Sequence, residues 1–277
     1  MELNNLIQQA LIEDAGDGDH TSLACIVKGT QSKAKLLVKE DGILAGMRVA
    51  LEVFKQVDSQ LKINALLNDG DMIRKGDVAF FVEGSVHSIL LAERLVLNIM
   101  QRMSGIATIT HSIVKKLEGT SCQVLDTRKT TPLLRSLEKE AVRIGGGVNH
   151  RIGLYDMILI KDNHVDYAGG ITAALNAAVD YLAKTGKNLK IEIETRNLKE
   201  LEEAIQHGGM HRVMFDNYAM EDLVEGVKMV NKKFETEASG GITPENVRSY
   251  AETGVDFISM GCLTHSVKSL DLSLKAC

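Results

Sequence analysis

The chain has 277 residues, of which 44% are apolar and 25% charged, and its formal net charge is −5. This length suits one large or two smaller folded domains, and the composition is typical of a globular protein, which excludes disorder, a coiled coil and a fibrous repeat. The four cysteines lack the spacing of a zinc site and indicate reduced, structural thiols. The first residues carry no basic-then-apolar leader and the most apolar stretch is interrupted by charges, so we expect a cytoplasmic protein that has no membrane partner.

The first third of the chain has the pattern of a small α/β domain. Residues 33–85 contain short apolar runs between Gly and Asp turns, which predict mainly β structure with one helix around residues 47–56. Apolar residues at helical spacing follow over residues 88–117, where Ser104 and Gly105 predict a break.

The rest of the chain alternates between strand and helix patterns. Strands are predicted at 122–126, 156–161, 190–194, 212–216, 234–239 and 255–261, with helices near 132–144, 170–184, 197–207, 219–231 and 243–252. Repeated βα units predict a parallel sheet, either doubly wound or closed into a barrel. Five of these strands lead into charged or polar groups, which would meet at one rim of a barrel, so we favour the barrel.

Positive charge is concentrated in one segment of this acidic chain. Residues 128–161 hold seven Lys or Arg and three acidic residues, which leaves 25 basic and 34 acidic residues elsewhere. With only 4% aromatic residues, this pattern suits a small polyanion better than nucleic acid. Arg135, Lys139 and Arg143 have the spacing of a solvated helix face. The other cations flank predicted strands, where solvation is a weaker explanation: Arg128, Lys129, His150, Arg151 and Lys161.

Helix boundaries and glycine loops add two expectations. Thr131 and Gly145 have the residue types that begin and end a helix, and Thr243 is typical of the cap of a later one. The loops "SGGIT" and "SMGC" each place glycine before a predicted helical start, where free backbone N–H groups can bind phosphate. Ordinary glycine turns explain each loop about equally well.

Longer motifs resemble a known family. The segment "DTRKTTPLLRSLEKEAVRIGGGVNHRIGLYDMILIKDNH" resembles the signature of quinolinate phosphoribosyltransferase, and the similarity extends to "IEDAGDGDHTS", "AERLVLNIMQRMSGIAT", "EIET", "FDNY", "EASGGIT" and "GVDFISMGCLTHS". The resemblance covers nearly the whole chain. It implies an N-terminal α/β sandwich domain with a helical linker (residues 1–110), an incompletely closed parallel α/β barrel (residues 111–277), and a homodimer whose sites borrow residues from the neighbouring subunit.

The resemblance also implies an activity. Members transfer phosphoribosyl from 5-phosphoribosyl-1-pyrophosphate to quinolinate with loss of carbon dioxide, which gives nicotinate mononucleotide for NAD synthesis. Magnesium accompanies the pyrophosphate substrate, and no organic cofactor is tightly bound. The quinolinate pocket is implied to consist of Arg128, His150, Arg151, Lys161 and, from the partner subunit, Arg94. The phosphoribosyl substrate is implied to meet Thr127, Lys129, Glu194, Asp216, Ser239, Gly240, Gly241 and Gly261.

Within that set, the resemblance assigns catalytic roles to Lys129, Glu194 and Asp216, with the two acids near the ribose hydroxyls and the magnesium ion. Quinolinate carries adjacent carboxylates, and charge-assisted hydrogen bonds from cationic side chains hold such groups strongly. Glu192 lies on the same predicted strand as Glu194, and we expect only Glu194 to face the site. His164 is the one remaining histidine close to a predicted ligand.

Two alternatives stay open from the sequence. A related phosphoribosyltransferase of the same fold could act on another pyridine or pyrimidine. A non-catalytic protein could keep the anion pocket as a metabolite sensor, although Glu194 and Asp216 would be unfavourable beside anions in a pure carboxylate binder.

Overall fold

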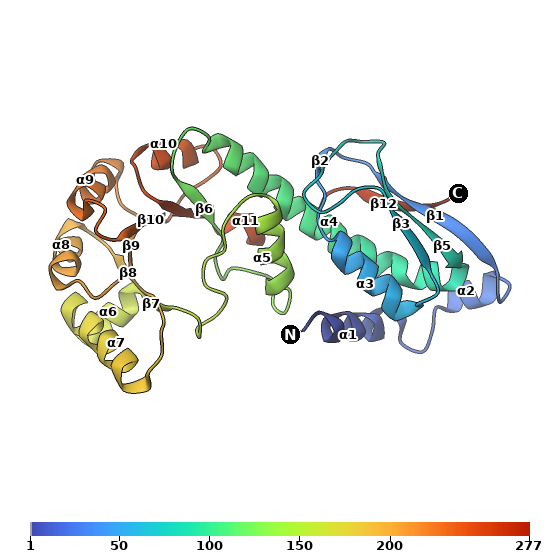
Figure 1. Cartoon of the computed structure of the whole chain (residues 1–277), viewed down its shortest axis with the longest axis horizontal. Helices are drawn as coiled ribbons and strands as arrows, with labels where there is room; N and C mark the ends of the chain where they lie inside the picture. The colour runs from blue at the N-terminus through green and yellow to red at the C-terminus, as the bar shows by residue number, and fades with distance from the viewer. Residues whose placement is uncertain (1) are drawn as a thin grey trace. The chain divides into compact units, whose positions relative to one another are not determined.

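The computed structural model describes residues 2–277, which form two compact units (Figure 1). The first comprises the chain up to His111 together with Thr130–Gly146 and Ser266–Cys277, and the second comprises Ser112–Lys129 and Gly147–His265. These units differ from the expected domains 1–110 and 111–277, because a helix and the last strand from the second half of the chain pack with the first unit.

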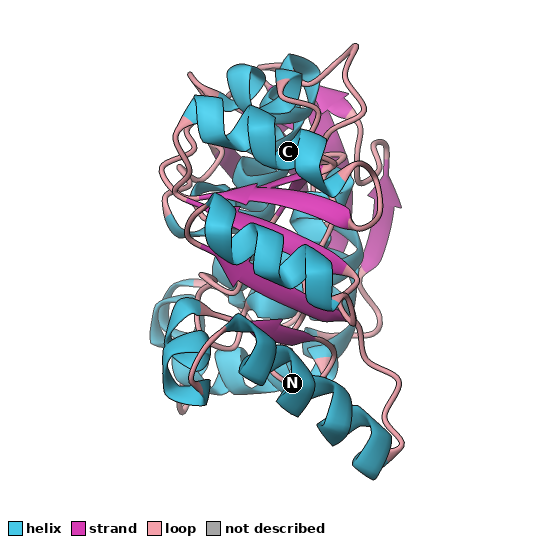
Figure 2. Cartoon of the chain, turned by 90° about the vertical axis from the view of Figure 1, so that its left-hand side faces the viewer, coloured by secondary structure: helices cyan, strands magenta, loops and turns pink. Residues whose placement is uncertain are grey.

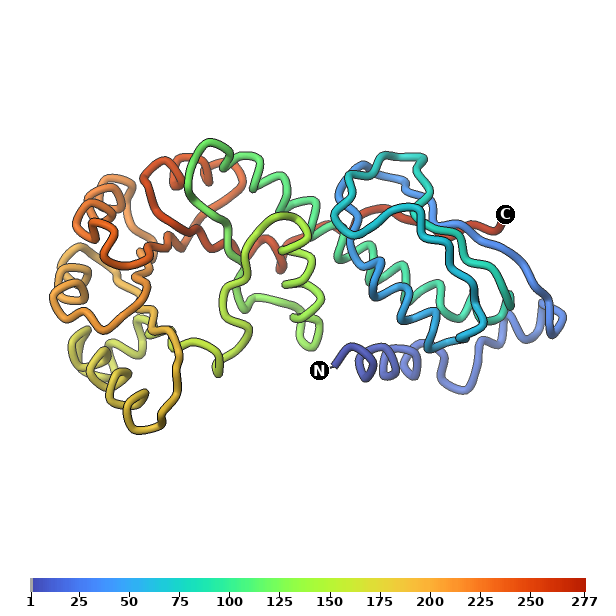
Figure 3. The backbone as a smooth tube through the Cα atoms, viewed as in Figure 1, coloured from blue at the N-terminus to red at the C-terminus, as the bar shows by residue number. Residues whose placement is uncertain are grey.

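The first unit contains most of the N-terminal elements. They are α1 (Leu3–Ala15), α2 (His20–Cys25), β1 (Gln31–Val38), β2 (Gly42–Ile43), α3 (Met47–Val57), β3 (Lys62–Ala65), β4 (Met72–Ile73), β5 (Val78–Ser85), most of α4 (Val86–Lys116), α5 (Arg135–Ile144) and β12 (Leu272–Ala276). A four-stranded antiparallel sheet has the order β12-β1-β5-β3. In Figure 3 the red C-terminal strand accordingly runs beside the blue β1.

Helix α3 covers this sheet with an apolar face. Val49, Val53 and Phe54 are buried, and the ring of Phe54 meets that of Phe80 on β5 edge-on at 5.6 Å. Because one helix face and one sheet face each remove apolar surface from water, this contact forms the core of the predicted α/β sandwich.

The long helix α4 is continuous, so the predicted break at Ser104 and Gly105 is wrong. A side chain at Gly105 would overlap the backbone carbonyl of Lys268. The hydroxyl of Ser104 accepts a hydrogen bond from the Ala45 N–H at 2.9 Å. The two small residues therefore serve close packing within the first unit, a tertiary requirement that mimics a helix-breaking signal.

Helix α5 begins at Arg135, three residues later than predicted, and ends at Ile144, with Gly145 directly after it as expected. Leu134 and not Thr131 stands at its cap position, because the residues before it form a turn with Leu133 at φ 67°, in which the Thr131 N–H donates to the Glu138 carboxylate at 3.1 Å. Lys139 is buried, with 1% of its surface exposed, so the predicted solvated face does not include it.

The second unit alternates strand and helix as predicted. Its elements are β6 (Gln123–Leu125), β7 (Ile158–Ile160), α6 (Asp162–Ala168), α7 (Ile171–Thr185), β8 (Ile191–Thr195), α8 (Leu198–His207), β9 (Arg212–Asp216), α9 (Met220–Val230), β10 (Glu235–Ser239), α10 (Val247–Glu252), β11 (Phe257–Ser259) and α11 (Cys262–His265). The strands form one parallel sheet, and Figure 2 shows helices lying against the strands.

The strand order identifies an open barrel. Strands β7 to β11 are neighbours in chain order, and β6 pairs with β11, giving the order β6-β11-β10-β9-β8-β7. Val148 adds one parallel bridge to Leu125 beyond β6. Among residues 2–277 no backbone pairing joins β7 to β6 or to Val148, so the ring is incompletely closed. This confirms the predicted fold class.

Two details differ from the sequence predictions. Helix α6 was not predicted. Helix α10 begins at Val247, and Thr243 is not its cap, because the Thr243 N–H donates to the Asn246 side chain at 2.8 Å within a preceding turn. Within the described part of the chain, no helix is both long and apolar enough to cross a membrane.

Candidate active site

A cavity of about 640 Å³ opens at the carboxyl ends of the barrel strands in the second unit. Twelve residues predicted as ligands line it: Thr127, Arg128, Lys129, His150, Arg151, Lys161, Glu194, Asp216, Ser239, Gly240, Gly241 and Gly261. Arg94 lies on α4 in the first unit and does not line this cavity. Its assignment involves a partner subunit and stays a prediction.

Asp126 connects β6 to the segment that carries two of the cations. Its fully buried carboxylate accepts hydrogen bonds from the His150 N–H at 2.9 Å and from the side-chain amide of Asn149. The Val148 N–H donates to the Val124 carbonyl at 2.9 Å. Together these bonds hold residues 148–150 beside β6. The residues that follow β6, 127–129, and residues 150–151 therefore line the same cavity.

Arg128 and Arg151 bring two guanidinium groups to the cavity. Burial lowers the pKa of Arg151, and the nearby charge of Arg128 lowers it further. Arg151 Nη1 donates one hydrogen bond to the Met157 carbonyl at 3.3 Å. Repulsion between two neighbouring cations is relieved by a ligand with two negative charges, and a guanidinium matches the geometry of a carboxylate.

Lys161, Glu194 and Asp216 form the opposite, acidic part of the site. Lys161 Nζ lies 3.3 Å from Glu194 Oε2. Burial raises the pKa of Glu194, Lys161 opposes this, and the Asp216 charge raises it further. Carboxylate oxygens are the ligands that Mg²⁺ prefers, and two like charges close together favour a cation, so this pair fits magnesium.

His164 has a structural role next to Lys161. Its Nδ1 accepts the backbone N–H of Lys161 at 2.9 Å and completes a capping box at the start of α6. This side-chain cap fixes the backbone of Lys161 at the end of β7. The histidine therefore positions a predicted ligand without lining the cavity itself.

The glycine loops bring backbone close to the cavity. Gly240 has φ 93°, and a side chain there would overlap the Asn217 amide; a Cβ at Gly261 would lie 2.9 Å from Lys129 Cδ. Within residues 2–277 the N–H groups of Gly240 and Gly241 donate no hydrogen bond. Such free N–H groups can bind a phosphate.

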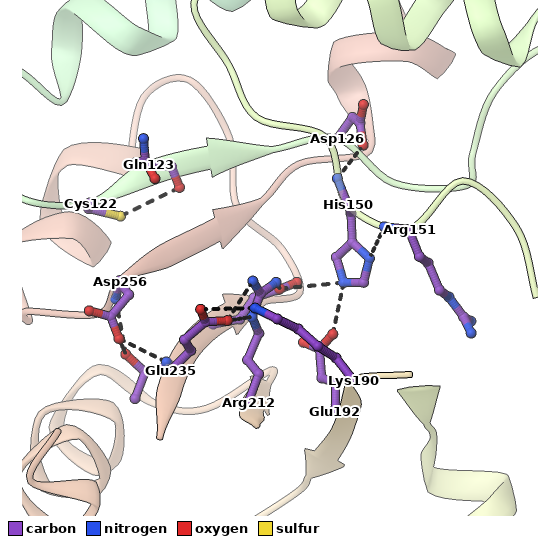
Figure 4. A network of polar contacts seen from close by, with 12 residues as sticks. Cys122, Gln123, Asp126, His150, Arg151, Lys190, Glu192, Arg212, Glu235 and Asp256 are labelled. Atoms are coloured by element: carbon purple, nitrogen blue, oxygen red, sulfur yellow. Dashed lines mark hydrogen bonds and ion pairs between the residues drawn. The ribbon is translucent and has the colours of Figure 1, made fainter. Parts of the chain in front are cut away.

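Beneath the cavity lies a buried cluster of charges (Figure 4). His150 Nε2 is 3.0 Å from Glu192 Oε2 and 3.5 Å from Glu237 Oε2, and Arg212 Nη1 lies 2.9 Å from Glu237 Oε2. Burial lowers the pKa of His150, but interactions of the ring N–H with the carboxylates of Glu192 and Glu237 raise it to about 9. Donation from the Arg151 N–H to Nδ1, at 2.7 Å, favours the neutral ring and acts against them.

The position of Glu192 corrects the expectation that only Glu194 points toward the site. Residues two apart in a strand share a face, so both acids point into the barrel. Glu194 lines the cavity, whereas Glu192 lies deeper against His150. The same period relates Glu237 to Ser239 on β10, and that spacing could have revealed Glu237, which the sequence reasoning missed together with Asp126.

Comparisons with known proteins agree with this geometry. The family model described as "Quinolinate phosphoribosyl transferase, N-terminal domain" matches residues 19–104, and the model of the C-terminal domain matches residues 106–275. The chain belongs to the quinolinate phosphoribosyltransferase family. A decarboxylating quinolinate phosphoribosyltransferase of Nicotiana tabacum is 46% identical over 99% of this chain and 82% of its own length. A probable carboxylating nicotinate-nucleotide pyrophosphorylase of Bacillus subtilis is 43% identical over 99% and 93%.

A solved structure extends the family likeness to the fold. The nicotinate-nucleotide pyrophosphorylase of Francisella tularensis has a TM-score of 0.92 to this chain, with 38% identity over 99% of this chain and 96% of the other. The family models and the solved structure therefore cover both units of this member of the quinolinate phosphoribosyltransferase family.

Proposed function

We propose that the protein transfers phosphoribosyl from 5-phosphoribosyl-1-pyrophosphate to quinolinate and releases pyrophosphate and carbon dioxide, forming nicotinate mononucleotide. One observation carries this proposal: a single cavity brings together cations, acids and glycine loops with free N–H groups. The cations match a dicarboxylate, the acids match ribose hydroxyls with magnesium, and the loops match a phosphate.

The cationic residues bind and orient the first substrate. Arg128, Arg151 and Lys161 hold the two adjacent carboxylates of quinolinate, with His150 beneath them. This places the ring nitrogen toward C1 of the ribose. The nitrogen lone pair forms the bond to C1 while the bond from C1 to the pyrophosphate oxygen breaks, so no side chain has to act as a general base.

The acidic residues stabilise the reacting sugar. Positive charge develops on C1 and the ring oxygen as pyrophosphate leaves, and Glu194 and Asp216 are placed to stabilise that charge and to hold the ribose hydroxyls. Lys129 offers positive charge to the leaving pyrophosphate. Ser239, Gly240, Gly241 and Gly261 bind the 5-phosphate, and Thr127 lies beside Lys129 at the same rim.

Decarboxylation follows from the first step. Once the ring nitrogen is positively charged, the electrons of the breaking bond to the adjacent carboxylate can flow toward it, and a proton then replaces carbon dioxide on that carbon. The magnesium ion, held by Glu194 and Asp216, would neutralise charge on the pyrophosphate. The homodimer, the contribution of Arg94 from a partner subunit and the cytoplasmic location belong to the same proposal.

The test is an assay of the purified protein with quinolinate, phosphoribosyl pyrophosphate and magnesium that follows nicotinate mononucleotide and carbon dioxide. Nicotinate as substrate and Arg151→Ala as variant are the paired controls. We expect product from quinolinate only, and its loss in the variant. Turnover of nicotinate instead would indicate the related-phosphoribosyltransferase alternative, and quinolinate binding with no product would indicate a sensor.

A further inference from the structure

The interior of this barrel contains charges where barrels of this kind are filled with apolar residues. Glu192 and Glu237 are both 0% exposed, and Arg212 is 7% exposed. Barrel interiors are dominated by branched apolar side chains, and buried charges are costly unless they are paired. A cluster of this kind needs a reason beyond stability, because apolar residues of similar size are often at least as stabilising.

The contacts of the cluster assign the proton of the His150 ring. Nδ1 accepts the Arg151 N–H at 2.7 Å, so the proton lies on Nε2. Nε2 of His150 faces both carboxylates, while the second carboxylate is also held by Arg212 at 2.9 Å. His150 is the only one of the four that was predicted to bind substrate.

His150, Glu192 and Glu237 could be read as a metal site, but their surroundings argue against one. His150, Glu192 and Glu237 place potential ligand atoms within 4.8 Å of one another. However, the guanidinium of Arg212 already bonds to Glu237, and it would repel a metal ion at that position. The geometry therefore favours a proton on Nε2, directed at these carboxylates, in place of a metal ion.

We propose that Glu192 and Glu237 are positioning residues, which hold the imidazole of His150 in one orientation at the floor of the dicarboxylate pocket. This inference rests on the proposed function. The carboxylates lie 3.0 Å and 3.5 Å from Nε2, and the Arg151 N–H donates to Nδ1, so both ring nitrogens are held and the plane of the ring is fixed. Loss of either carboxylate leaves Nε2 without one of these contacts.

The chain offers a matched control. Glu235 lies on the same strand and bonds to the same arginine, at 2.9 Å from Arg212 Nη2, but it is half-exposed, whereas Glu237 is fully buried 3.5 Å from His150 Nε2. Glu237→Gln and Glu235→Gln therefore make the same chemical change beside Arg212, and only the first also removes a charge beside the imidazole.

The experiment measures kcat and the KM of each substrate for the two variants. We expect Glu237→Gln to raise the KM for quinolinate by about tenfold or more, since it removes a buried charge that lies 3.5 Å from Nε2. The KM for phosphoribosyl pyrophosphate should stay unchanged and thereby report an intact barrel. Glu235→Gln should change both values by less than about twofold. Equal quinolinate KM values in the two variants would overturn the inference.

A double-mutant cycle and a pH profile distinguish positioning from a merely structural role. If Glu237 acts through His150, adding Glu237→Gln to His150→Gln should cause no further rise in the quinolinate KM; a full additional rise contradicts the inference. Glu192 and Glu237 face Nε2 of the ring, and the Arg151 N–H donates to Nδ1. Asp126 holds the backbone N–H of His150, and Arg212 is paired with Glu237. Removing one carboxylate should move the alkaline loss of quinolinate affinity to lower pH in Glu237→Gln and not in Glu235→Gln.

Failure of this inference can be distinguished from failure of the proposed function. If Glu237→Gln does not fold, Glu192→Gln provides the same test, because it leaves the bond between Arg212 and Glu237 in place. If the unmodified protein does not consume quinolinate, the proposed function fails, whereas normal turnover with an indifferent Glu237→Gln variant contradicts only the positioning role.

Discussion

Replacing Asp126 with asparagine tests how the barrel positions its anion pocket. The carboxylate is fully buried and accepts two hydrogen bonds, from the His150 N–H and from the Asn149 side chain. Asparagine keeps one acceptor oxygen and loses the charge, so one of the two bonds is lost. A hydrogen bond to a charged group contributes about 1.5 to 3 kcal/mol, and we expect the free energy of unfolding to fall by about that amount.

The control is Asp256→Asn. Asp256 also accepts two hydrogen bonds, from the backbone N–H and the hydroxyl of Thr236, but Thr236 does not line the cavity, whereas His150 does. We expect urea denaturation to show a similar loss of stability in both variants. Only Asp126→Asn should raise the KM for quinolinate, by roughly tenfold, since about 1.4 kcal/mol of misplaced binding energy corresponds to that factor. An unchanged quinolinate KM in a destabilised Asp126→Asn protein would refute the positioning argument.

Three further predictions concern the pocket, the pH dependence and the core. Arg151→Lys should raise the quinolinate KM by about 10- to 100-fold in a steady-state assay, because an ammonium cannot make the paired bonds of a guanidinium to a carboxylate. The pKa of His150 is raised from 6.5 to about 9, so its protonation stabilises the folded protein fully below pH 6.5, and this contribution is lost as the pH rises through 9; His150→Gln should flatten the fall in unfolding free energy over that range. Gly105→Ala should lower the free energy of unfolding by about 1 to 3 kcal/mol in thermal denaturation, because its methyl group would overlap the Lys268 carbonyl.

The barrel was predictable because its signals are local. Short apolar runs followed by polar groups mark β6 to β11, and the polar groups at their ends became the cavity lining. The helix starts were predicted less well, because turns with side-chain hydrogen bonds precede them. The Thr131 N–H donates to Glu138 in the turn before α5, and the Thr243 N–H donates to Asn246 in the turn before α10. Neither bond is visible as a residue pattern.

The buried cluster was missed for a different reason. Taken singly, Glu192, Glu237 and Arg212 read as surface charges in strands, and their pairing depends on the register of three neighbouring strands. Arg212 is opposite Glu192 on one side and Glu235 on the other. This register is what places the guanidinium of Arg212 and the carboxylates of Glu192 and Glu237 below residues 148–150, which β6 and Asp126 hold in place.

The two layers of the barrel interior explain why the acids do not weaken the anion pocket. In the proposed function the acids at the rim, Glu194 and Asp216, face the reacting sugar, and Lys161 Nζ lies 3.3 Å from Glu194 Oε2. The deeper acids face His150 and Arg212, and Glu237 also lines the cavity. A dicarboxylate would meet positive charge from Arg128, Arg151 and Lys161, while the charge of Glu237 is held by the guanidinium of Arg212 at 2.9 Å. The two-residue period of each strand puts one acid at the rim and one deeper in the barrel, which would let the barrel bind a dianion close to where it stabilises a cationic transition state.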